Sequence, residues 1–453
     1  MSKTVKLKKG LNIKLVGEAE EVSAEFVLPK SISVRPSDFH GLTPKMAVKA
    51  GDTVLAGDTL FFNKYKEKVK CVSPISGVVR DIIRGEKRRI IEVIVDSDGS
   101  QNYKTSGPIN PTSVSREDLK EHMLNNGLWM YIKQRPIDIV ADPETVPKAI
   151  FVSAFDSSPL AADLDFMLHG ESENFQAGLD ALSKLTDGIV HLTLNGESTS
   201  GEVFSNSKNV QINKISGKHP AGNVGTQIHH IDPINKGELV WTVNAQDVMI
   251  IGRCLLTGKF DTSKMIALTG SEVKNRKYYK TVTCASISEF VKKNIEGENV
   301  RVVSGNPLTG EKISQDGYLG FYANQITVLP EGNEYKFFLT KGWLGPGFDK
   351  YSNSRLFPTF LSPNKGKRLD TNTNGEERGF VVTGEMEKVF PFDILPMQLV
   401  KAAITDDIDG MENLGIYEVI PEDFALCEYV CTSKINIQDK IRTALDLIQD
   451  ECM

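Results

Sequence analysis

The chain has 453 residues, of which 40% are hydrophobic and 25% are charged, and its formal net charge is -6. This length exceeds what one hydrophobic core normally serves, so we expect three or four domains. The mild acidity argues against a general affinity for nucleic acid. The basic residues 1–10 are not followed by the apolar stretch of a secretory signal, and no run of about 18 apolar residues predicts a membrane span.

The six cysteines are dispersed and form no CxxC pair; they stand at positions 71, 254, 284, 427, 431 and 452. A disulfide framework, a zinc site and an iron–sulfur cluster all need closer groupings of cysteines than this. Dispersed thiols fit a protein kept in a reducing cytosol.

The clearest local pattern lies within residues 33–96, where Gly51-Asp52 and Gly57-Asp58 mark two turns between short apolar runs. A further strand, turn and strand follow over residues 72–79, and the region resembles a biotinyl/lipoyl-type barrel-sandwich hybrid. Carriers of that fold hold a lysine between two methionines at a hairpin tip. Residues 63–70 have the lysines without the methionines, so a structural barrel with a basic hairpin is favoured over a carrier.

This hairpin and a nearby basic run are candidates for docking an acidic partner, although such runs are usually solvated faces. The candidate docking residues are Lys64, Lys66, Lys68 and Arg88. We assign residues 1–98, including the N-terminal strands, to this first domain.

Residues 99–260 show strands alternating with helices, after a polar linker at 97–112. Apolar runs predict strands at 149–154, 188–194 and 210–215, and helices are expected from Ser115, from Pro159, over 175–185 and between Asn244 and Gly258. Such alternation predicts a parallel, Rossmann-like α/β domain. Ligands of these sheets bind beyond the carboxyl ends of the strands.

Residues 217–233 follow the third of these strands and form the leading candidate site, expected as a polar loop. This stretch and its apolar flank supply the candidate binding residues, which are His219, Gly222, Gly225, His229, His230 and Trp241.

Neither a GxGxxG fingerprint nor a complete P-loop is present, because Asn223 and Val224 replace the Lys and Ser/Thr that would hold phosphate and Mg²⁺. The histidines lack metal-type spacing, so no metal and no catalytic residue is assigned. A quinone fits better, because an imidazole or a backbone N–H could donate to its carbonyl oxygen; buried core roles remain the alternative.

The last two predicted domains cover residues 261–335 and 336–453. The first has the order strand, strand, helix and strand, with the helix expected over 287–294, which predicts a β-grasp module. The second is irregular at first and then helical, with Ile437, Ile441, Leu445 and Ile448 on one stripe. Cys427 and Cys431 would share a helix face, where buried apolar roles are favoured over cluster binding.

Over essentially its full length the chain resembles the A-subunit of the bacterial Na⁺-translocating NADH:quinone oxidoreductase. The resemblance is carried by residues 6–11, 48–60, 73–78, 219–232, 240–251 and 426–431. That family is related to the C-subunit of the Rnf complex and to the flavin-binding subunit of complex I, which carry iron–sulfur clusters, flavin and NADH. The sequence lacks their cluster cysteines and their glycine loop, which implies an electron-transfer scaffold without a redox cofactor of its own.

The resemblance implies a peripheral subunit on the cytoplasmic side of the inner membrane, within a translocase of class EC 7.2.1.1. It would lie on the membrane-embedded B-subunit, with the C-subunit as a further partner, and contribute contacts to ubiquinone or menaquinone. NADH, flavins, iron–sulfur centres and Na⁺ would be handled by other subunits. The alternative is a purely structural scaffold that caps the B-subunit while quinone binds elsewhere. A free-standing flavin or NAD enzyme is disfavoured by the missing glycine fingerprint.

Overall fold

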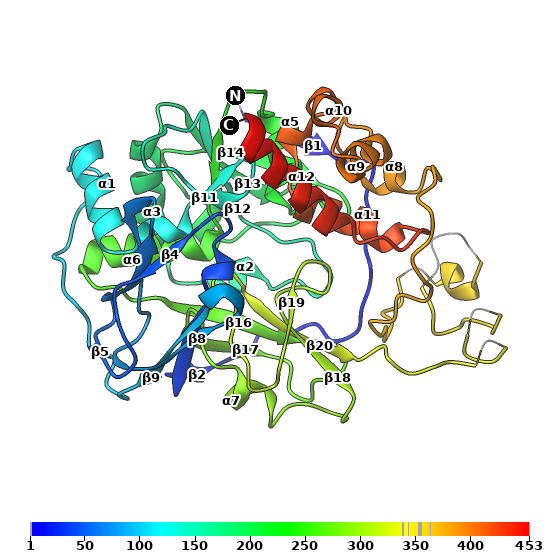
Figure 1. Ribbon diagram of the computed structural model, residues 1–453, viewed down its shortest axis with the longest axis horizontal. Helices are drawn as coiled ribbons and strands as arrows, with labels where there is room; N and C mark the ends of the chain where they lie inside the picture. The colour runs from blue at the N-terminus through cyan, green and yellow to red at the C-terminus, as the bar shows by residue number, and fades with distance from the viewer. Residues whose placement is uncertain (1, 338, 343, 352–355, 363, 453) are drawn as a thin grey trace.

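The computed structural model describes residues 2–337, 339–342, 344–351, 356–362 and 364–452. Two small sheets, two larger mixed sheets and a group of C-terminal helices pack around one another (Figure 1). In the part of the chain that the structure describes, no helix is both long and apolar enough to cross a membrane.

The first domain contains the two small sheets. The four-stranded sheet has the order β3 (Ser31–Val34), β9 (Ile90–Ser97), β8 (Gly77–Arg84) and β5 (Thr53–Val54), and the three-stranded sheet has the order β4 (Pro44–Met46), β6 (Thr59–Asn63) and β7 (Lys66–Val72). Both predicted Gly-Asp turns are confirmed: the Asp52 and Asp58 carboxylates accept backbone N–H groups three residues earlier, and Gly51 and Gly57 have positive φ. Only glycine adopts such a φ without strain.

The α/β domain is built on a seven-stranded sheet. Its strand order is β1 (Thr4–Lys6), β14 (Gln211–Ser216), β13 (Ile189–Asn195), β12 (Ala149–Ser153), β15 (Val240–Thr242), β10 (Lys133–Arg135) and β11 (Ile139–Val140). The first five strands are parallel, which confirms the three predicted strands and their direction. The chain's first strand completes one edge of this sheet and so lies outside the two small sheets.

Helices cover both faces of this sheet, with α3 (Ser172–Leu185) and α6 (Ala245–Thr257) on one face and α5 (Val224–Ile231) on the other. The other helices of this domain are α1 (Arg116–Asn125), α2 (Leu164–Met167) and α4 (Glu202–Ser205). Ser115 caps α1 by accepting the Asp118 N–H, and Gly258 ends α6 in a left-handed conformation, as expected.

Two local predictions in this domain are wrong. No helix starts at Pro159, because Leu160 takes a positive φ of 59° and the carboxylate of Asp163 caps a helix that begins only at Leu164. Residues 217–233 are not a loop throughout, because α5 occupies Val224–Ile231. Ile228 and Ile231 bury against the sheet, and this packing outweighs the turn-like composition of the stretch.

The third part is a six-stranded sheet with the order β19 (Glu311–Ile313), β18 (Val300–Ser304), β20 (Gln325–Pro330), β16 (Ser263–Thr269), β17 (Tyr278–Val282) and β2 (Ser23–Phe26). The chain's second strand thus pairs with β17, although the two are far apart in the sequence. The expected helix over 287–294 is shorter, α7 (Ser288–Val291). The β-grasp assignment stays a prediction.

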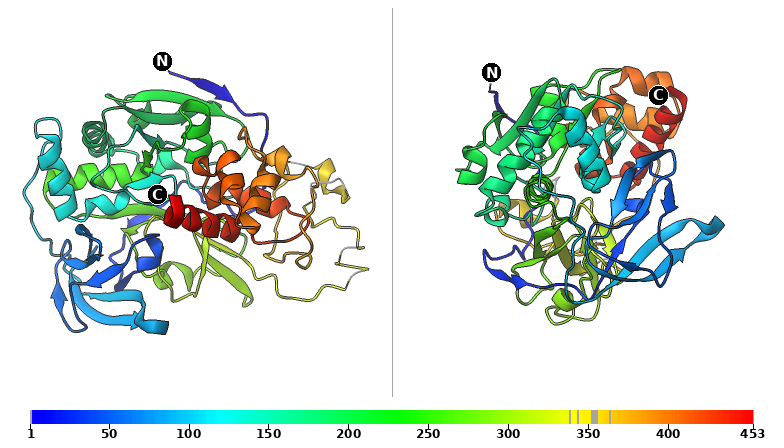
Figure 2. Two further views of the ribbon diagram at one scale, coloured as in Figure 1. Left: turned by 45° about the horizontal axis from the view of Figure 1, so that its top comes forward. Right: turned by 90° about the vertical axis from the view of Figure 1, so that its left-hand side faces the viewer.

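The last part is helical, with α8 (Met386–Val389), α9 (Pro396–Ile404), α10 (Ile408–Asn413), α11 (Ala425–Val430) and α12 (Ile437–Cys452). The predicted stripe on α12 is confirmed, because all four of its isoleucine and leucine side chains are fully buried. Cys427 and Cys431 are buried as well. The described residues between β20 and α8 extend away from the body at one end of the molecule (Figures 1 and 2).

Candidate functional site

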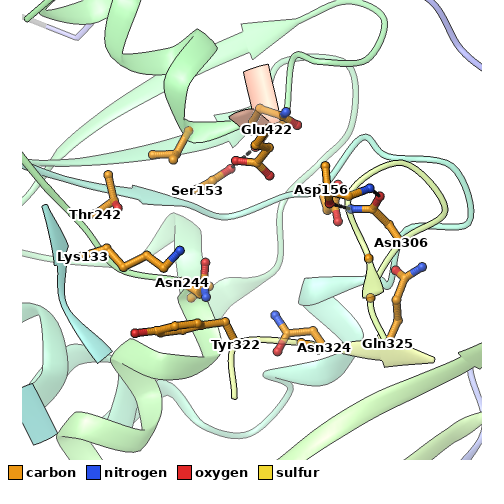
Figure 3. A pocket seen from close by; sticks show the side chains of 18 of the residues that line it. Lys133, Ser153, Asp156, Thr242, Asn244, Asn306, Tyr322, Asn324, Gln325 and Glu422 are labelled. Carbon is orange, nitrogen blue, oxygen red and sulfur yellow. Dashed lines mark hydrogen bonds between the residues drawn. The ribbon is translucent and has the colours of Figure 1, made fainter. Parts of the chain in front are cut away.

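A cavity of about 470 Å³ lies where the α/β domain, the six-stranded sheet and the C-terminal helices meet (Figure 3). This volume falls within the range of small-molecule sites. Polar side chains from all three parts point into it, and apolar side chains such as Phe155 and Leu164 complete the lining. The cavity is therefore suited to a small ligand with both polar atoms and an apolar body.

The α/β domain places the cavity at the edge where its parallel strands end. β12 ends at Ser153 and β15 at Thr242, and both residues line the cavity. α5 follows Asn223 and α6 follows Asn244, so two helix N-termini, whose first N–H groups have no partner within the helix, border the same space. This is the edge at which open α/β sheets bind their ligands.

Lys133 and Tyr322 lie next to each other in the lining. The Lys133 ammonium bonds to Asp138 at 3.1 Å and lies 4.7 Å from the centre of the Tyr322 ring. The Tyr322 hydroxyl donates to the Met130 carbonyl at 2.6 Å, so its ring rather than its hydroxyl serves the cavity. An ammonium carries three donors, so Lys133 can hold Asp138 and still donate to a ligand acceptor.

A buried ion cluster borders the cavity on the side of the C-terminal helices. Arg135 Nη1 bonds to Asp423 Oδ2 at 2.9 Å, and both side chains are inaccessible to solvent. Asp423 also accepts the backbone N–H of Ile420 at 2.9 Å. Breaking such a buried pair by removing one partner is strongly destabilising. The cluster therefore joins the helical end to the α/β domain.

The carboxyl groups of Glu422 and Asp138 also belong to this cluster and line the cavity, and their pKa values change in opposite directions. Burial beside Asp423 raises the pKa of Glu422 from its ordinary 4.5 to about 7, although Arg135, 3.8 Å away, acts in the other direction. Burial alone would raise the pKa of Asp138, but Lys133 and Arg135 outweigh it and lower that pKa. Near neutral pH Glu422 can accordingly hold or release a proton, while Asp138 stays ionised.

The structure places His219, Gly222 and Gly225 around the start of α5. The Gly222 N–H donates to Ser157 Oγ at 2.7 Å, and Ser157 Oγ lies 3.1 Å from His219 Nδ1. Ser157 can then donate its own hydrogen to His219, which fixes the neutral Nε2–H tautomer. Burial lowers the pKa of His219 to about 4, in keeping with a neutral ring.

The two glycines serve close packing. A Cβ on Gly222 would lie 2.5 Å from the Ser157 nitrogen, and one on Gly225 would lie 2.2 Å from Asp423 Oδ1. Of the six candidate binding residues, Gly222 lines the cavity.

His229 and His230 lie on α5 and contact the C-terminal helical part. His229 Nε2 accepts the Asp393 N–H at 3.0 Å, so its Nδ1 carries the hydrogen that it donates to Glu418 at 2.7 Å. His230 Nε2 donates to the Pro391 carbonyl at 3.0 Å. Both rings are thus engaged in contacts within the molecule.

Trp241 points to the opposite face of the sheet from α5. It is 1% exposed and packs edge-on against Trp129, with ring centroids 5.4 Å apart. The six candidate residues therefore lie before α5, along it and on the opposite face of the sheet, and they do not form one pocket.

The candidate docking residues are exposed, but they belong to two different hairpins. Lys64, Lys66 and Lys68 lie at the β6–β7 hairpin, and Arg88 lies in the connection from β8 to β9. Lys66 forms an ion pair with Asp142 at 2.6 Å.

Sequence reasoning missed Lys133, Tyr322, Asn324 and Glu422 as lining residues. A signal for the first was present: Lys133 and Arg135 end an otherwise apolar and aromatic run at 128–132. Charges in such a strand are rarely buried without a partner. The others come from chain segments far away, and no local pattern marks them.

Among the described residues, no group of three or more His, Cys, Asp or Glu side chains could hold a metal ion. The connection after β12, which a dinucleotide site would fill with glycines, holds Phe155, Asp156 and Ser157.

Family models match three regions of the chain. Residues 5–98 match the NqrA N-terminal barrel-sandwich hybrid domain, residues 114–260 the NqrA second alpha/beta domain, and residues 265–315 the NQRA C-terminal domain. The curated relatives are similar along the full length. One from Rhodopirellula baltica is 37% identical over 98% of both chains and is named as the A-subunit of Na(+)-translocating NADH-quinone reductase.

The chain belongs to the NqrA family, the A-subunits of Na⁺-translocating NADH-quinone reductase. Other NqrA relatives are also similar along nearly their full length. The one from a Marinomonas species is 36% identical over 98% of this chain and 99% of its own, and the one from Neisseria meningitidis serogroup A is 36% identical over 99% and 100%. The predicted membership and the predicted barrel-sandwich hybrid domain are both confirmed.

A solved structure of an NAD⁺-reducing NiFe hydrogenase in the air-oxidised state aligns with 41% of this NqrA-family chain and 40% of its own. The sequence identity is 15% and the TM-score 0.31.

Proposed function

We propose that this NqrA-family chain lies on the cytoplasmic side of the membrane-embedded B-subunit, with the C-subunit as a neighbour, and contributes quinone contacts without a redox cofactor of its own. NADH, flavins, iron–sulfur centres and Na⁺ are then handled by other subunits. The relatives' shared name supports membership of the complex. The single observation that supports the quinone role is the cavity at the carboxyl ends of β12 and β15.

The cavity matches the chemistry of a quinone head group, which is a flat ring with two acceptor oxygens. The Tyr322 ring offers a face on which the quinone ring can stack. Lys133 and the amide of Asn324 offer donors for the two carbonyl oxygens (Figure 3). Both residues come from outside the stretch 217–233, which contributes Gly222, Asn223 and Val224 to the lining.

A second function, a purely structural scaffold that caps the B-subunit, is favoured by a different observation. His219, His229 and His230 are all occupied by contacts within the molecule. In that case the cavity holds water, and quinone binds elsewhere in the complex.

Titration calorimetry of the full chain with a short-tailed, water-soluble quinone separates the two functions. We expect saturable binding, weakened about tenfold or more by Lys133→Met, because a charge-assisted hydrogen bond contributes about 1.5–3 kcal/mol. Lys133→Met keeps the aliphatic stem, so packing against Tyr322 is retained. His230→Gln, on α5 outside the lining, is the matched control and should bind as wild type does.

If the wild-type chain shows no saturable binding, the quinone role is wrong and the scaffold function remains. Equal weakening by both variants would place the quinone away from Lys133.

A further inference from the structure

The segment between β20 and α8 differs from the rest of the chain in composition. In the sequence, residues 335–368 carry seven basic residues and one acidic residue, Asp349, whereas the whole chain has a net charge of -6. The basic residues are Lys336, Lys341, Lys350, Arg355, Lys365, Lys367 and Arg368. Eight aromatic residues lie among them, in a chain that is 8% aromatic overall. We call residues 335–368 the basic aromatic segment.

Both ends of the basic aromatic segment are fastened to the body of the molecule. Asn372 donates to the Gly332 carbonyl at 2.8 Å, so the chain leaves and returns at nearly one place. Arg368 binds Glu272 with two hydrogen bonds of 2.8 and 3.0 Å. Between these fixed ends the described residues of the segment project from one end of the molecule (Figures 1 and 2).

Large apolar side chains of the basic aromatic segment face solvent. The exposed fractions are 106% for Tyr335, 53% for Leu339, 52% for Leu344, 75% for Phe348 and 72% for Leu361. Exposed apolar side chains concentrated in one segment favour contact with another surface.

Lysines stand between these apolar side chains. Lys341 and Lys365 are exposed, and neither forms an ion pair with any other residue that the structure describes. Lysine is depleted at protein–protein interfaces, whereas aromatic and leucine side chains mixed with lysine are typical of segments that lie in the interface of a membrane. Exposed leucines also distinguish the segment from a nucleic-acid surface, where aromatic and arginine side chains stack on bases.

We propose that the basic aromatic segment binds the anionic surface of a phospholipid bilayer, with exposed side chains such as Phe348 and Leu361 at the level of the headgroups and lysines such as Lys341 and Lys365 against the lipid phosphates. This goes beyond attachment through the B-subunit, because the chain would contact lipid directly and through a different region from the β6–β7 hairpin. Each lysine near an anionic leaflet strengthens binding by a factor of about five.

Vesicle flotation of the full chain tests this inference. We expect the chain to float with vesicles made of equal parts phosphatidylcholine and phosphatidylglycerol, to stay behind with phosphatidylcholine alone, and to be released by high salt. Lys341→Glu with Lys365→Glu should weaken binding at least about tenfold, because two favourable charges become repulsive. Phe348→Ser with Leu361→Ser should weaken it by a similar factor, because two apolar anchors are lost.

The matched control is Val146→Ser with Lys208→Glu, which alters one exposed apolar residue and one exposed lysine elsewhere and should float as wild type does. Equal flotation on neutral and anionic vesicles would overturn the inference, as would wild-type flotation of either segment variant. If the segment variants float normally but fail to assemble with the detergent-solubilised membrane subunits, the segment is a protein interface instead.

Discussion

At the scale of single residues, the cavity lining combines one fixed charge pair with one group that titrates near neutral pH. Lys133 and Asp138 hold each other in the charged state, whereas Glu422 has its pKa raised to about 7. Local sequence places Asp138 close to Lys133, but it cannot show that Glu422 lies beside Arg135, which is in a distant part of the chain. Glu422 and Arg135 lie close together because the C-terminal helices dock on the α/β domain.

The raised pKa of Glu422 makes the stability of the chain depend on pH. The unfolded chain gives up this proton near its ordinary pKa of 4.5, whereas the folded chain keeps it up to about 7. The contribution of this group is therefore fully present below pH 4.5 and is lost as the pH rises through 7.

Glu422→Gln should mimic the protonated side chain at every pH. Relative to wild type, this variant should gain unfolding free energy, and the gain should be larger at about pH 8 than at about pH 5 by about 1–2 kcal/mol. This difference allows for screening by solvent, which reaches the Glu422 side chain. Urea denaturation at both pH values measures this difference. An equal effect of the substitution at both would show that Glu422 titrates normally.

At the scale of elements, those with complete local signals were predicted well. α1 has its Ser115 cap, α6 has Asn244 and Gly258 at its ends, and α12 has a continuous apolar stripe. α5 was missed because its Gly225, its two histidines and the preceding Pro220 and Gly222 suggest a turn, and only packing on the sheet makes it helical. The partners of β1 and β2 were missed because strand pairing between distant parts of the chain leaves no local pattern.

α5 also carries the contact that joins the helical end to the α/β domain. Gly225→Ala would put a Cβ 2.2 Å from Asp423 Oδ1 and 2.5 Å from Arg135 Nη1, within a fully buried ion pair. We expect the unfolding free energy to fall by about 3 kcal/mol or more, since the pair must separate or the helices must shift. Gly379→Ala, where a Cβ meets nothing within 4 Å, is the control and should change stability by less than about 0.5 kcal/mol.

Thermal denaturation followed by circular dichroism compares the two alanine variants. Similar small losses for both would mean that the α5 contact does not determine how the C-terminal helices are held.

At the scale of the whole molecule, three parts of the chain meet at the cavity, and none of them forms it alone. The α/β domain supplies Ser153 and Thr242, the six-stranded sheet supplies Asn324 and its neighbours, and the C-terminal part supplies Glu422. Sequence reasoning pointed to the edge of the α/β sheet at which the cavity lies, because ligands of parallel α/β sheets generally bind after the carboxyl ends of the strands. The residues that line the cavity from the other two parts of the chain could not be predicted from the sequence, so the candidate site was assigned to the nearest polar stretch, 217–233.

Hydrogen–deuterium exchange of the full chain, with and without a short-tailed quinone, tests the quinone role of the cavity most directly. A quinone in the cavity should slow exchange of backbone amides at residues 242–245 and 322–325, which border it from two different domains. Unchanged exchange at both stretches under saturating quinone, or protection confined to other regions, would contradict a quinone site in the cavity.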